Sequence, residues 1–354
     1  MKNFYFWTNA FCVNEENIWF IHGKASILFK YNIRLKKTQA IGVLPEKNMW
    51  NEGLYKKILF KDDKIYIIPC HAKKIIKYDI KNNEFSQIYI KEHDGMMFVN
   101  AFLVNEKIIC IPYSYPGVVS IDTRFDTAKI EYDMSTIMNE NSIQYFNSAD
   151  CLNGVIAMVS PQSDKGYLYY VENNKLEIIN VNNEGVRYNS VAMLQEKYIF
   201  CSKERKCIHV YDIKSGKILL LSWPLNEEGG CVWSLNNDEF MIDSATNAVN
   251  WIYDKNMKSY KWETSFINDR SMYYTYKIGA FDKKSGLYFN NCNMKFYEIK
   301  SNERPMEKCS IKITKDICKE TYELLKESEY YKNEIIYMEN AFSNLPLFLR
   351  SITE

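Results

Sequence analysis

The sequence of 354 residues is poor in glycine and arginine, with 13 and seven respectively, and it lacks any long hydrophobic run. No window approaches the roughly 18–20 apolar residues of a membrane-spanning helix, so we expect no membrane contact. Lys and Arg total 45 and Asp and Glu total 44, which leaves a net charge of +1. Without a global positive field, and with its few arginines scattered, the chain is not expected to bind nucleic acid.

The motifs of common catalytic and cofactor sites are also missing. The sequence has no Gly-x-Gly-x-x-Gly, no Gly-x4-Gly-Lys-Ser/Thr and no Gly-x-Ser-x-Gly. Its four histidines, at 22, 71, 93 and 209, stand at unrelated positions, so we expect no metal and no cofactor. His209 lies in the apolar run Ile208–Val210 and is interpreted as a surface histidine or a hydrogen-bonded core histidine.

Ten cysteines occur without a Cys-x-x-Cys pair, which argues against a zinc knuckle or a thioredoxin-like site. Several follow apolar runs, as Cys110 follows Ile108 and Ile109, and are interpreted as free buried thiols of a reducing compartment. Residues 1–9 have no unbroken apolar stretch of the kind that a signal peptide needs. We therefore expect a cytoplasmic protein without disulfides. The excess of Lys and Asn is typical of an AT-rich, bacterial genome.

Aromatic residues are abundant at 15%, and they occur in a repeat. A short apolar run that ends in an acid or amide and a polar turn recurs along the chain, as in Ile76–Ile80 and His209–Ile213. The seven acids or amides that anchor these units are Asn32, Asp79, Asp122, Glu172, Asp212, Asp254 and Glu298. Their spacings of 47, 43, 50, 40, 42 and 44 residues match a four-stranded propeller blade. We therefore predict an all-β, seven-bladed β-propeller over residues 1–312, with six blades as the alternative.

A second short apolar run precedes each anchor by roughly a dozen residues, for example at 65–68 and 108–111, and turn residues bound it. Such runs are typical of strands buried on both faces. With these units the sequence resembles the divergent kelch-like or WD40-like bacterial β-propellers. It departs from both types, because a Gly-Gly doublet occurs only at Gly229–Gly230 and neither Gly-His nor Trp-Asp recurs. The resemblance therefore implies the fold and no functional residue.

Four units place an asparagine after an aromatic residue and before a small one, at the expected start of a first strand. These asparagines are Asn9, Asn100, Asn147 and Asn189. First strands line the central channel of a propeller, so the amides are candidate ligand-binding residues at one ring face. In the alternative interpretation, each amide bonds a neighbouring backbone group.

Aromatic residues lie in or just before the same strands, namely Trp7, Trp50, Trp233, Tyr274 and Tyr276. Of these, Trp50, Trp233 and Tyr276 join the asparagines as candidate ligand-binding residues, because an aromatic face can stack on a ligand. The alternative is that they pack blade against blade.

Residues 313–354 are predicted to form a helical tail that packs on the propeller or docks a partner. Residues 315–326 show a loose apolar stripe, and Thr314 is a candidate N-cap. A strand-like run at 335–338 and a short helix opened by Pro346 follow. Because a ring must join its ends, residues 3–7 are predicted to pair near residues 309–313.

Three classes of function stay open at this point. The fold and the missing motifs favour a non-catalytic scaffold that recognises a protein or peptide partner through one ring face. A glycan- or sugar-binding propeller is the alternative. It includes a hydrolase or lyase whose loop carboxylates, about 5–10 Å apart, would act in catalysis. No catalytic residue is assigned.

Overall fold

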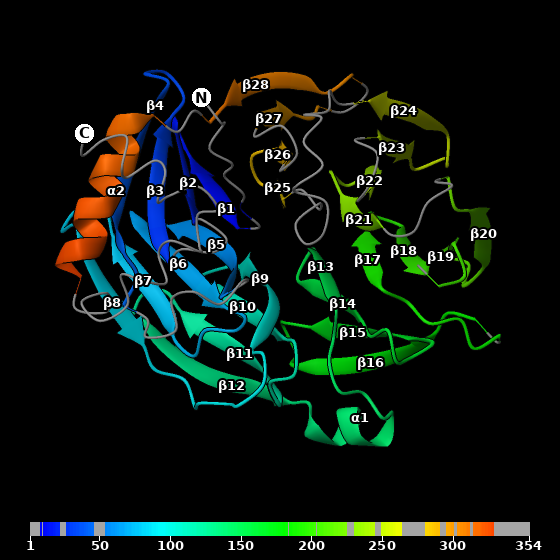
Figure 1. Cartoon of the computed structure of the whole chain (residues 1–354). Coiled ribbons are helices and arrows are strands. Elements are labelled where there is room, and N and C mark those ends of the chain that lie inside the picture. Colours follow the sequence, from blue (N-terminus) through cyan, green and yellow to red (C-terminus); the bar gives the residue numbers. More distant parts are fainter. Residues whose placement is uncertain are drawn as a thin grey trace.

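The computed structural model describes residues 8, 10–21, 26–45, 54–182, 184–202, 204–224, 230–244, 249–263, 280–290, 295–300, 303–311 and 314–328. These residues form seven four-stranded antiparallel sheets arranged as a ring (Figure 1). The seven blades of the prediction are therefore confirmed, and the six-bladed alternative is wrong.

Each blade is an uninterrupted meander whose strands pair in chain order. Blades 1 to 4 consist of β1 (Phe11–Asn14), β2 (Asn17–Ile21), β3 (Ile27–Asn32) and β4 (Lys37–Val43); β5 (Tyr55–Lys61), β6 (Lys64–Pro69), β7 (Ile75–Asp79) and β8 (Glu84–Ile88); β9 (Phe98–Val104), β10 (Lys107–Pro112), β11 (Gly117–Asp122) and β12 (Thr127–Asp133); and β13 (Ser148–Leu152), β14 (Val155–Val159), β15 (Lys165–Tyr170) and β16 (Lys175–Asn180).

Blades 5 to 7 repeat the same plan. They consist of β17 (Ser190–Met193), β18 (Lys197–Ser202), β19 (Cys207–Asp212) and β20 (Ile218–Ser222); β21 (Gly230–Ser234), β22 (Glu239–Ser244), β23 (Val249–Asp254) and β24 (Ser259–Glu263); and β25 (Ala280–Asp282), β26 (Leu287–Asn290), β27 (Lys295–Glu298) and β28 (Met306–Ser310). Two helices accompany the blades, α1 (Ser135–Glu140) between blades 3 and 4 and α2 (Lys315–Glu327) after blade 7.

The predicted anchors end the third strand of a blade or, for Glu172, lie in the turn that follows it. The side chains of five of them, Asn32, Asp79, Asp122, Asp212 and Asp254, accept backbone N–H groups of this turn. The Asp79 carboxylate accepts the backbone N–H groups of Lys81 and Asn82 at 2.9 and 3.0 Å. The Asp254 carboxylate accepts those of Asn256 and Lys258 at 2.8 and 2.9 Å. The repeat seen in the sequence is therefore a repeat of side-chain-capped hairpin turns.

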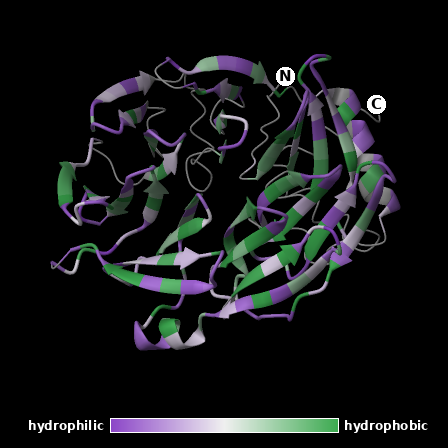
Figure 2. Cartoon of the chain, turned by 180° about the vertical axis from the view of Figure 1, so that it is seen from behind, coloured by the Kyte–Doolittle hydropathy of each residue, from purple (hydrophilic) through white to green (hydrophobic). Residues whose placement is uncertain are grey.

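The core lies between the blades. Seven apolar clusters occur among the described residues, one at each junction of neighbouring blades around the ring. Second strands such as Lys64–Pro69 are apolar without alternation because both of their faces are covered. Figure 2 shows the same division, with apolar residues along the strands and hydrophilic residues at many of the turns.

The seam between blades 7 and 1 is closed by side chains of the described residues. Phe296 of β27 meets Phe11 of β1 edge to face at 5.1 Å, and Tyr31 of β3 shares a hydrogen bond with Cys309 of β28. Of the predicted pairing between residues 3–7 and residues 309–313, residues 3–7 and 312–313 lie outside the described residues. Cys309 itself pairs with Phe296 within blade 7.

Helix α2 lies along β4 at the rim of blade 1 (Figure 1). Ile317 is buried in the cluster of the seam and Leu324 packs against it. The Thr314 hydroxyl accepts the N–H of Ile317 at 3.4 Å, so the predicted N-cap is confirmed. Residues 335–338 and 346–354 lie outside the described residues. Among the residues that are described, no helix has the length and apolar character to cross a membrane.

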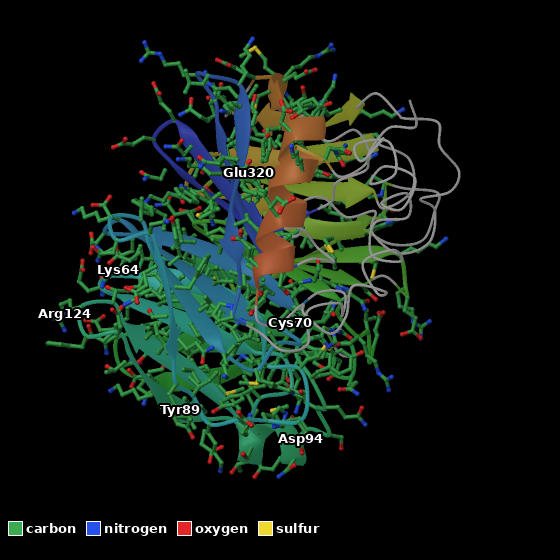
Figure 3. All side chains as sticks on the ribbon, turned by 60° about the vertical axis from the view of Figure 1, so that its left-hand side comes forward. Lys64, Cys70, Tyr89, Asp94, Arg124 and Glu320 are labelled. Carbon is green, nitrogen blue, oxygen red and sulfur yellow. The ribbon has the colours of Figure 1, made fainter. Side chains whose placement is uncertain are left out.

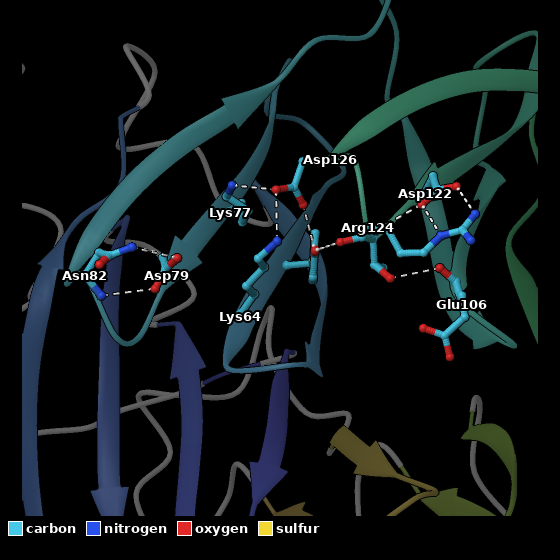
Figure 4. Close-up of polar contacts among 10 residues, drawn as sticks. Lys64, Lys77, Asp79, Asn82, Glu106, Asp122, Arg124 and Asp126 are labelled. Atoms are coloured by element: carbon cyan, nitrogen blue, oxygen red, sulfur yellow. Dashed lines mark hydrogen bonds and ion pairs between the residues drawn. The ribbon is translucent and has the colours of Figure 1, made fainter.

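Polar contacts join strands β6 and β7 of blade 2 to the turn between β11 and β12 of blade 3 (Figure 4). Asp126 accepts hydrogen bonds from Lys64 at 3.0 Å, Lys77 at 2.7 Å and the buried Tyr66 hydroxyl at 2.8 Å. Burial acts to raise the pKa of Asp126, but the bonds from Lys77, Tyr66 and Lys64 lower it below its usual value. This carboxylate therefore ties a turn of blade 3 to two strands of blade 2.

We predict that acid weakens the fold as carboxylates of these turns become protonated. Bonds from Arg124 lower the pKa of Asp122 to about 2, and backbone bonds lower those of Asp79 and Asp212. Each folded-state pKa lies below the unfolded value of about 4, so the unfolded chain binds more protons in this range. The melting temperature should fall between about pH 4 and pH 2, as measured by circular dichroism.

The control for this prediction is Asp122→Asn, which keeps a side-chain acceptor but cannot titrate. Its melting temperature should fall less steeply over the same pH range. A wild-type melting temperature that stays level from pH 4 to pH 2 would contradict the assignment.

Candidate functional site

The meander gives the ring two different faces. Turns after the first and third strands of each blade form one face, which we call the turn face. Connections after the second and fourth strands form the other, the loop face. Its described residues in blades 2–4 are 70–74, 89–97, 113–116, 134–147, 160–164, 181–182 and 184–189. Figure 3 shows Lys64 and Arg124 of the turn face on one side of the molecule, with Cys70 and Asp94 of the loop face on the other.

Two of the predicted asparagines bridge neighbouring blades near the axis. The Asn100 amide of β9 donates to the carbonyl of Ala149 in β13 at 2.9 Å, and its oxygen accepts the N–H of Ala101. The Asn147 amide, before β13, donates to the carbonyl of Asn189 at 2.8 Å, just before β17. These contacts match the alternative interpretation, in which each amide bonds a neighbouring backbone group.

The other predicted site residues are not gathered with these two. Asn189 precedes β17, and its backbone carbonyl accepts the hydrogen bond from the Asn147 amide. Trp233 lies near the turn-face end of β21 and packs against the cluster between blades 6 and 7. Asn9, Trp50 and Tyr276 lie outside the described residues, as do Trp7 and Tyr274. The ligand-binding role of all seven candidates stays a prediction.

Other polar side chains on first strands, which are not among the predicted site residues, also bond the next blade. Asp150 of β13 accepts the N–H of Met193 at 2.7 Å, and Ser190 of β17 accepts that of Val232 at 2.8 Å. Ser148 accepts the N–H of Val191 at 3.2 Å. First strands have no backbone neighbour on their inner edge, so these polar side chains supply the missing acceptors.

Lys283 crosses the channel at the turn face. It follows β25 in blade 7, and its ammonium donates to the Ser234 hydroxyl of blade 6 at 2.7 Å and to the Cys151 carbonyl of blade 4 at 3.3 Å. The Asp150 carboxylate lies 3.8 Å away. Blade 4 is three blades distant from blade 7, so this single side chain spans the ring and narrows this end of the channel.

The loops of blades 2–4 are fixed to one another by their backbones. The Tyr113 N–H donates to the Met97 carbonyl at 2.8 Å, and the Tyr113 carbonyl accepts the N–H of Phe146 at 2.9 Å. The Met97 N–H in turn donates to the Cys70 carbonyl at 2.6 Å. One chain of hydrogen bonds thus runs through four connections of the loop face.

Side chains brace the loop at 93–95 in the same region. The Lys73 ammonium donates to the carbonyls of His93, Asp94 and Gly95 at 2.5, 3.0 and 3.0 Å. The Ser114 hydroxyl donates to the Met96 carbonyl at 2.8 Å. A Cβ on Gly95 would clash with the Ser114 hydroxyl oxygen, so a larger residue there would require the Ser114 side chain to move.

Three tyrosines lie on these braced loops. Tyr89 is 83% exposed, and Tyr113 and Tyr145 stack with their ring centres 4.8 Å apart and their planes 2° from parallel. Burial, aided by Tyr145, raises the pKa of Tyr113 to about 12, so its hydroxyl stays protonated at neutral pH. The sequence shows these tyrosines but gives no sign that separate loops bring them to one face.

Several buried thiols among the described residues have shifted pKa values. Burial raises the pKa of the Cys70, Cys110 and Cys201 thiols, which keeps them protonated. The eight described cysteines form no disulfide with one another. Within the described part of the chain no group of His, Cys, Asp and Glu is arranged to hold a metal ion. His209 is buried and bonds Tyr188 at 3.0 Å, which confirms its interpretation as a core histidine.

Comparison with known proteins supports the fold and leaves the activity open. No protein-family model matches the sequence, and no curated protein matches it. A streptogramin B lyase shares the fold at 13% identity and a TM-score of 0.62, over 82% of this chain and 93% of that one. Kluyveromyces lactis Hsv2 shares it at 9% identity and a TM-score of 0.52, over 85% of this chain and 97% of that one. A chain of a mitotic checkpoint complex shares it at 11% identity and a TM-score of 0.58, over 84% of this chain and 89% of that one.

The protein is thus a seven-bladed β-propeller. At such identities the likeness shows the fold alone, and the same fold serves proteins named as a lyase and as part of an assembly. The kelch-like type expected from the sequence stays a prediction.

Proposed function

We propose that the protein is a non-catalytic binding module that holds a protein or peptide partner on the loop face of blades 2–4. The observation that carries the proposal is the set of Tyr89, Tyr113 and Tyr145 on braced loops of one face. Tyrosine is enriched at protein interfaces because it offers a large apolar area, a hydroxyl and only two rotatable side-chain bonds.

The bracing of these loops supports the same proposal. A loop that must be ordered on binding reduces the affinity by the entropy it loses. The Lys73 ammonium and the Tyr113 backbone already fix the connections of the loop face. A partner would therefore meet a surface that needs little rearrangement.

The loop face of blades 2–4 also carries polar residues, which suit a partner with polar groups at its margin. His71, Lys91, Glu92 and Asp94 are polar residues of the same face and carry both signs of charge. An aromatic centre with a mixed polar rim is typical of protein interfaces. The turn face is less suitable near the axis, because Lys283 crosses the channel there.

We predict that the double substitution Tyr89→Ala and Tyr145→Ala removes binding of the partner. Tagged protein is used to enrich partners from lysate of the source cells, and mass spectrometry quantifies them. Each tyrosine at the centre of an interface contributes about 2 kcal/mol, so enrichment of a true partner should fall at least about tenfold.

The matched control is Leu35→Ala with Phe125→Ala, which removes side chains 72% and 70% exposed on the turn face. It should leave enrichment unchanged. Loss of binding in the control and not in the tyrosine variant would overturn the proposal. So would retention of the wild-type protein on a glycan array without any enriched protein, which favours a sugar-binding propeller.

A further inference from the structure

The outermost strand of blade 5 differs from the outermost strands of the other blades. In β4, β8, β12, β16, β24 and β28 at least one residue is charged, whereas β20 reads Ile218–Leu219–Leu220–Leu221–Ser222. Charged residues on an edge strand discourage pairing with other chains, because the charge would be buried in the new sheet. Strand β20 lacks this protection.

The apolar side chains of β20 are open to solvent. Ile218, Leu219 and Leu220 are 42%, 50% and 60% exposed, and Ile213 in the preceding turn is 40% exposed. Figure 2 shows β20 as an apolar strand at the outer rim, on the opposite side from its place in Figure 1. Within the described residues β20 pairs with β19 alone, so its outer edge carries backbone groups without a strand partner.

We infer that β20 is a self-association edge, at which two copies of this chain pair their β20 strands antiparallel about a twofold axis. A twofold axis perpendicular to the joined sheet requires that one residue face its own copy. Leu220, the most exposed of the apolar residues of β20, takes this position. Leu219 then faces Leu221 of the second copy, and the two blades form one eight-stranded sheet.

The charge pattern suits a second copy of the chain. In this register Lys217 faces Trp223 of the second copy, so no like charges oppose each other. The two Lys217 positions lie six residues apart along the strand pair, about 20 Å, which is beyond the screening length of about 10 Å. The lysine stem can instead pack on the indole. The strand is thus complementary to itself.

The outer strand of blade 1, β4, is covered by a helix of the same chain. There α2 covers β4 with Ile317 and Leu324, so that edge is occupied by the chain itself. The described residues place no such cover over β20. Two copies meeting at β20 would cover each other's Leu219 and Leu220 and satisfy the outer backbone groups of both strands.

Sedimentation equilibrium of the full chain tests the proposal first. The wild-type protein should form dimers with a Kd of about 1–100 µM, the range for a small interface. Leu220→Lys places two ammonium groups opposite each other at the axis and should raise the Kd at least about tenfold. Because Leu220 is largely exposed, this variant should keep the wild-type melting temperature. Ile178→Lys, on the outer strand of blade 4, is the control and should leave the Kd unchanged.

Cross-linking then tests the register. Opposed residues of antiparallel strands have Cα atoms about 4.5–5.5 Å apart, which permits a disulfide. Leu220→Cys should therefore give a covalent dimer under mild oxidation, on a non-reducing gel, well above the level of wild-type protein and of Ile178→Cys. A wild-type protein that stays monomeric at 100 µM, a Leu220→Lys variant that dimerises as well as the wild type, or a Leu220→Cys variant without a cross-link overturns the inference.

Discussion

Replacing Phe296 with alanine should lower the free energy of unfolding by about 3–5 kcal/mol and loosen the ring between its last and first blades. The side chain is fully buried, meets Phe11 of blade 1 at 5.1 Å and Phe289 at 4.6 Å, and lies in the cluster that joins the two blades. Its loss leaves a cavity where the described ends of the ring meet.

The control is Phe240→Ala, which removes an equally buried ring between blades 5 and 6. Both variants should lose stability in urea unfolding. Hydrogen exchange separates them, since only Phe296→Ala should speed exchange in β1–β4 and β25–β28. If hydrogen exchange in β1–β4 and β25–β28 is the same in the two variants, the prediction that Phe296→Ala loosens the junction of blades 7 and 1 is wrong.

Replacing Asp150 with alanine should destabilise the fold by about 2–3 kcal/mol, although the residue lies on the channel and outside the apolar clusters. Its carboxylate accepts the N–H groups of Met193 and Cys151 and lies 3.8 Å from the Lys283 ammonium. Removal leaves two backbone donors unpaired. It also takes a nearby carboxylate from a lysine whose side chain is about one third exposed.

Asp150→Asn is the graded control, because its amide oxygen can still accept one N–H but carries no charge. In urea unfolding it should lower the free energy of unfolding by less than the alanine variant does. If both variants unfold at the wild-type urea concentration, then neither the contacts between first strands nor the reach of Lys283 across the channel holds the ring together.

The architecture was predictable from the sequence because the repeat depends on local chemistry. Anchors such as Asp79 and Asp254 cap turns within a few residues of themselves, so their period survives where the blades differ in sequence. The buried second strands were visible for the same reason, as apolar runs bounded by turn residues. The N-cap at Thr314 is likewise a local contact.

The site was less predictable because it depends on contacts between distant segments. In the described blades the aromatic-asparagine pattern lies at or near the start of the first strands β9, β13 and β17. The amides of Asn100 and Asn147, however, donate to backbone carbonyls of the next blade. Lys283 follows its strand in an ordinary turn, and its partners lie 49 and 132 residues away. Tyr113 and Tyr145 come from different loops, and no spacing rule brings them together.

Photo-crosslinking in the source cells tests the proposed binding face most directly. A photoreactive phenylalanine analogue is placed at Tyr89 on the loop face or at Phe125 on the turn face, which are 83% and 70% exposed. Irradiation should produce a discrete heavier adduct with a protein partner from position 89 and none from position 125. An adduct from position 125 alone would contradict the loop face as the binding surface.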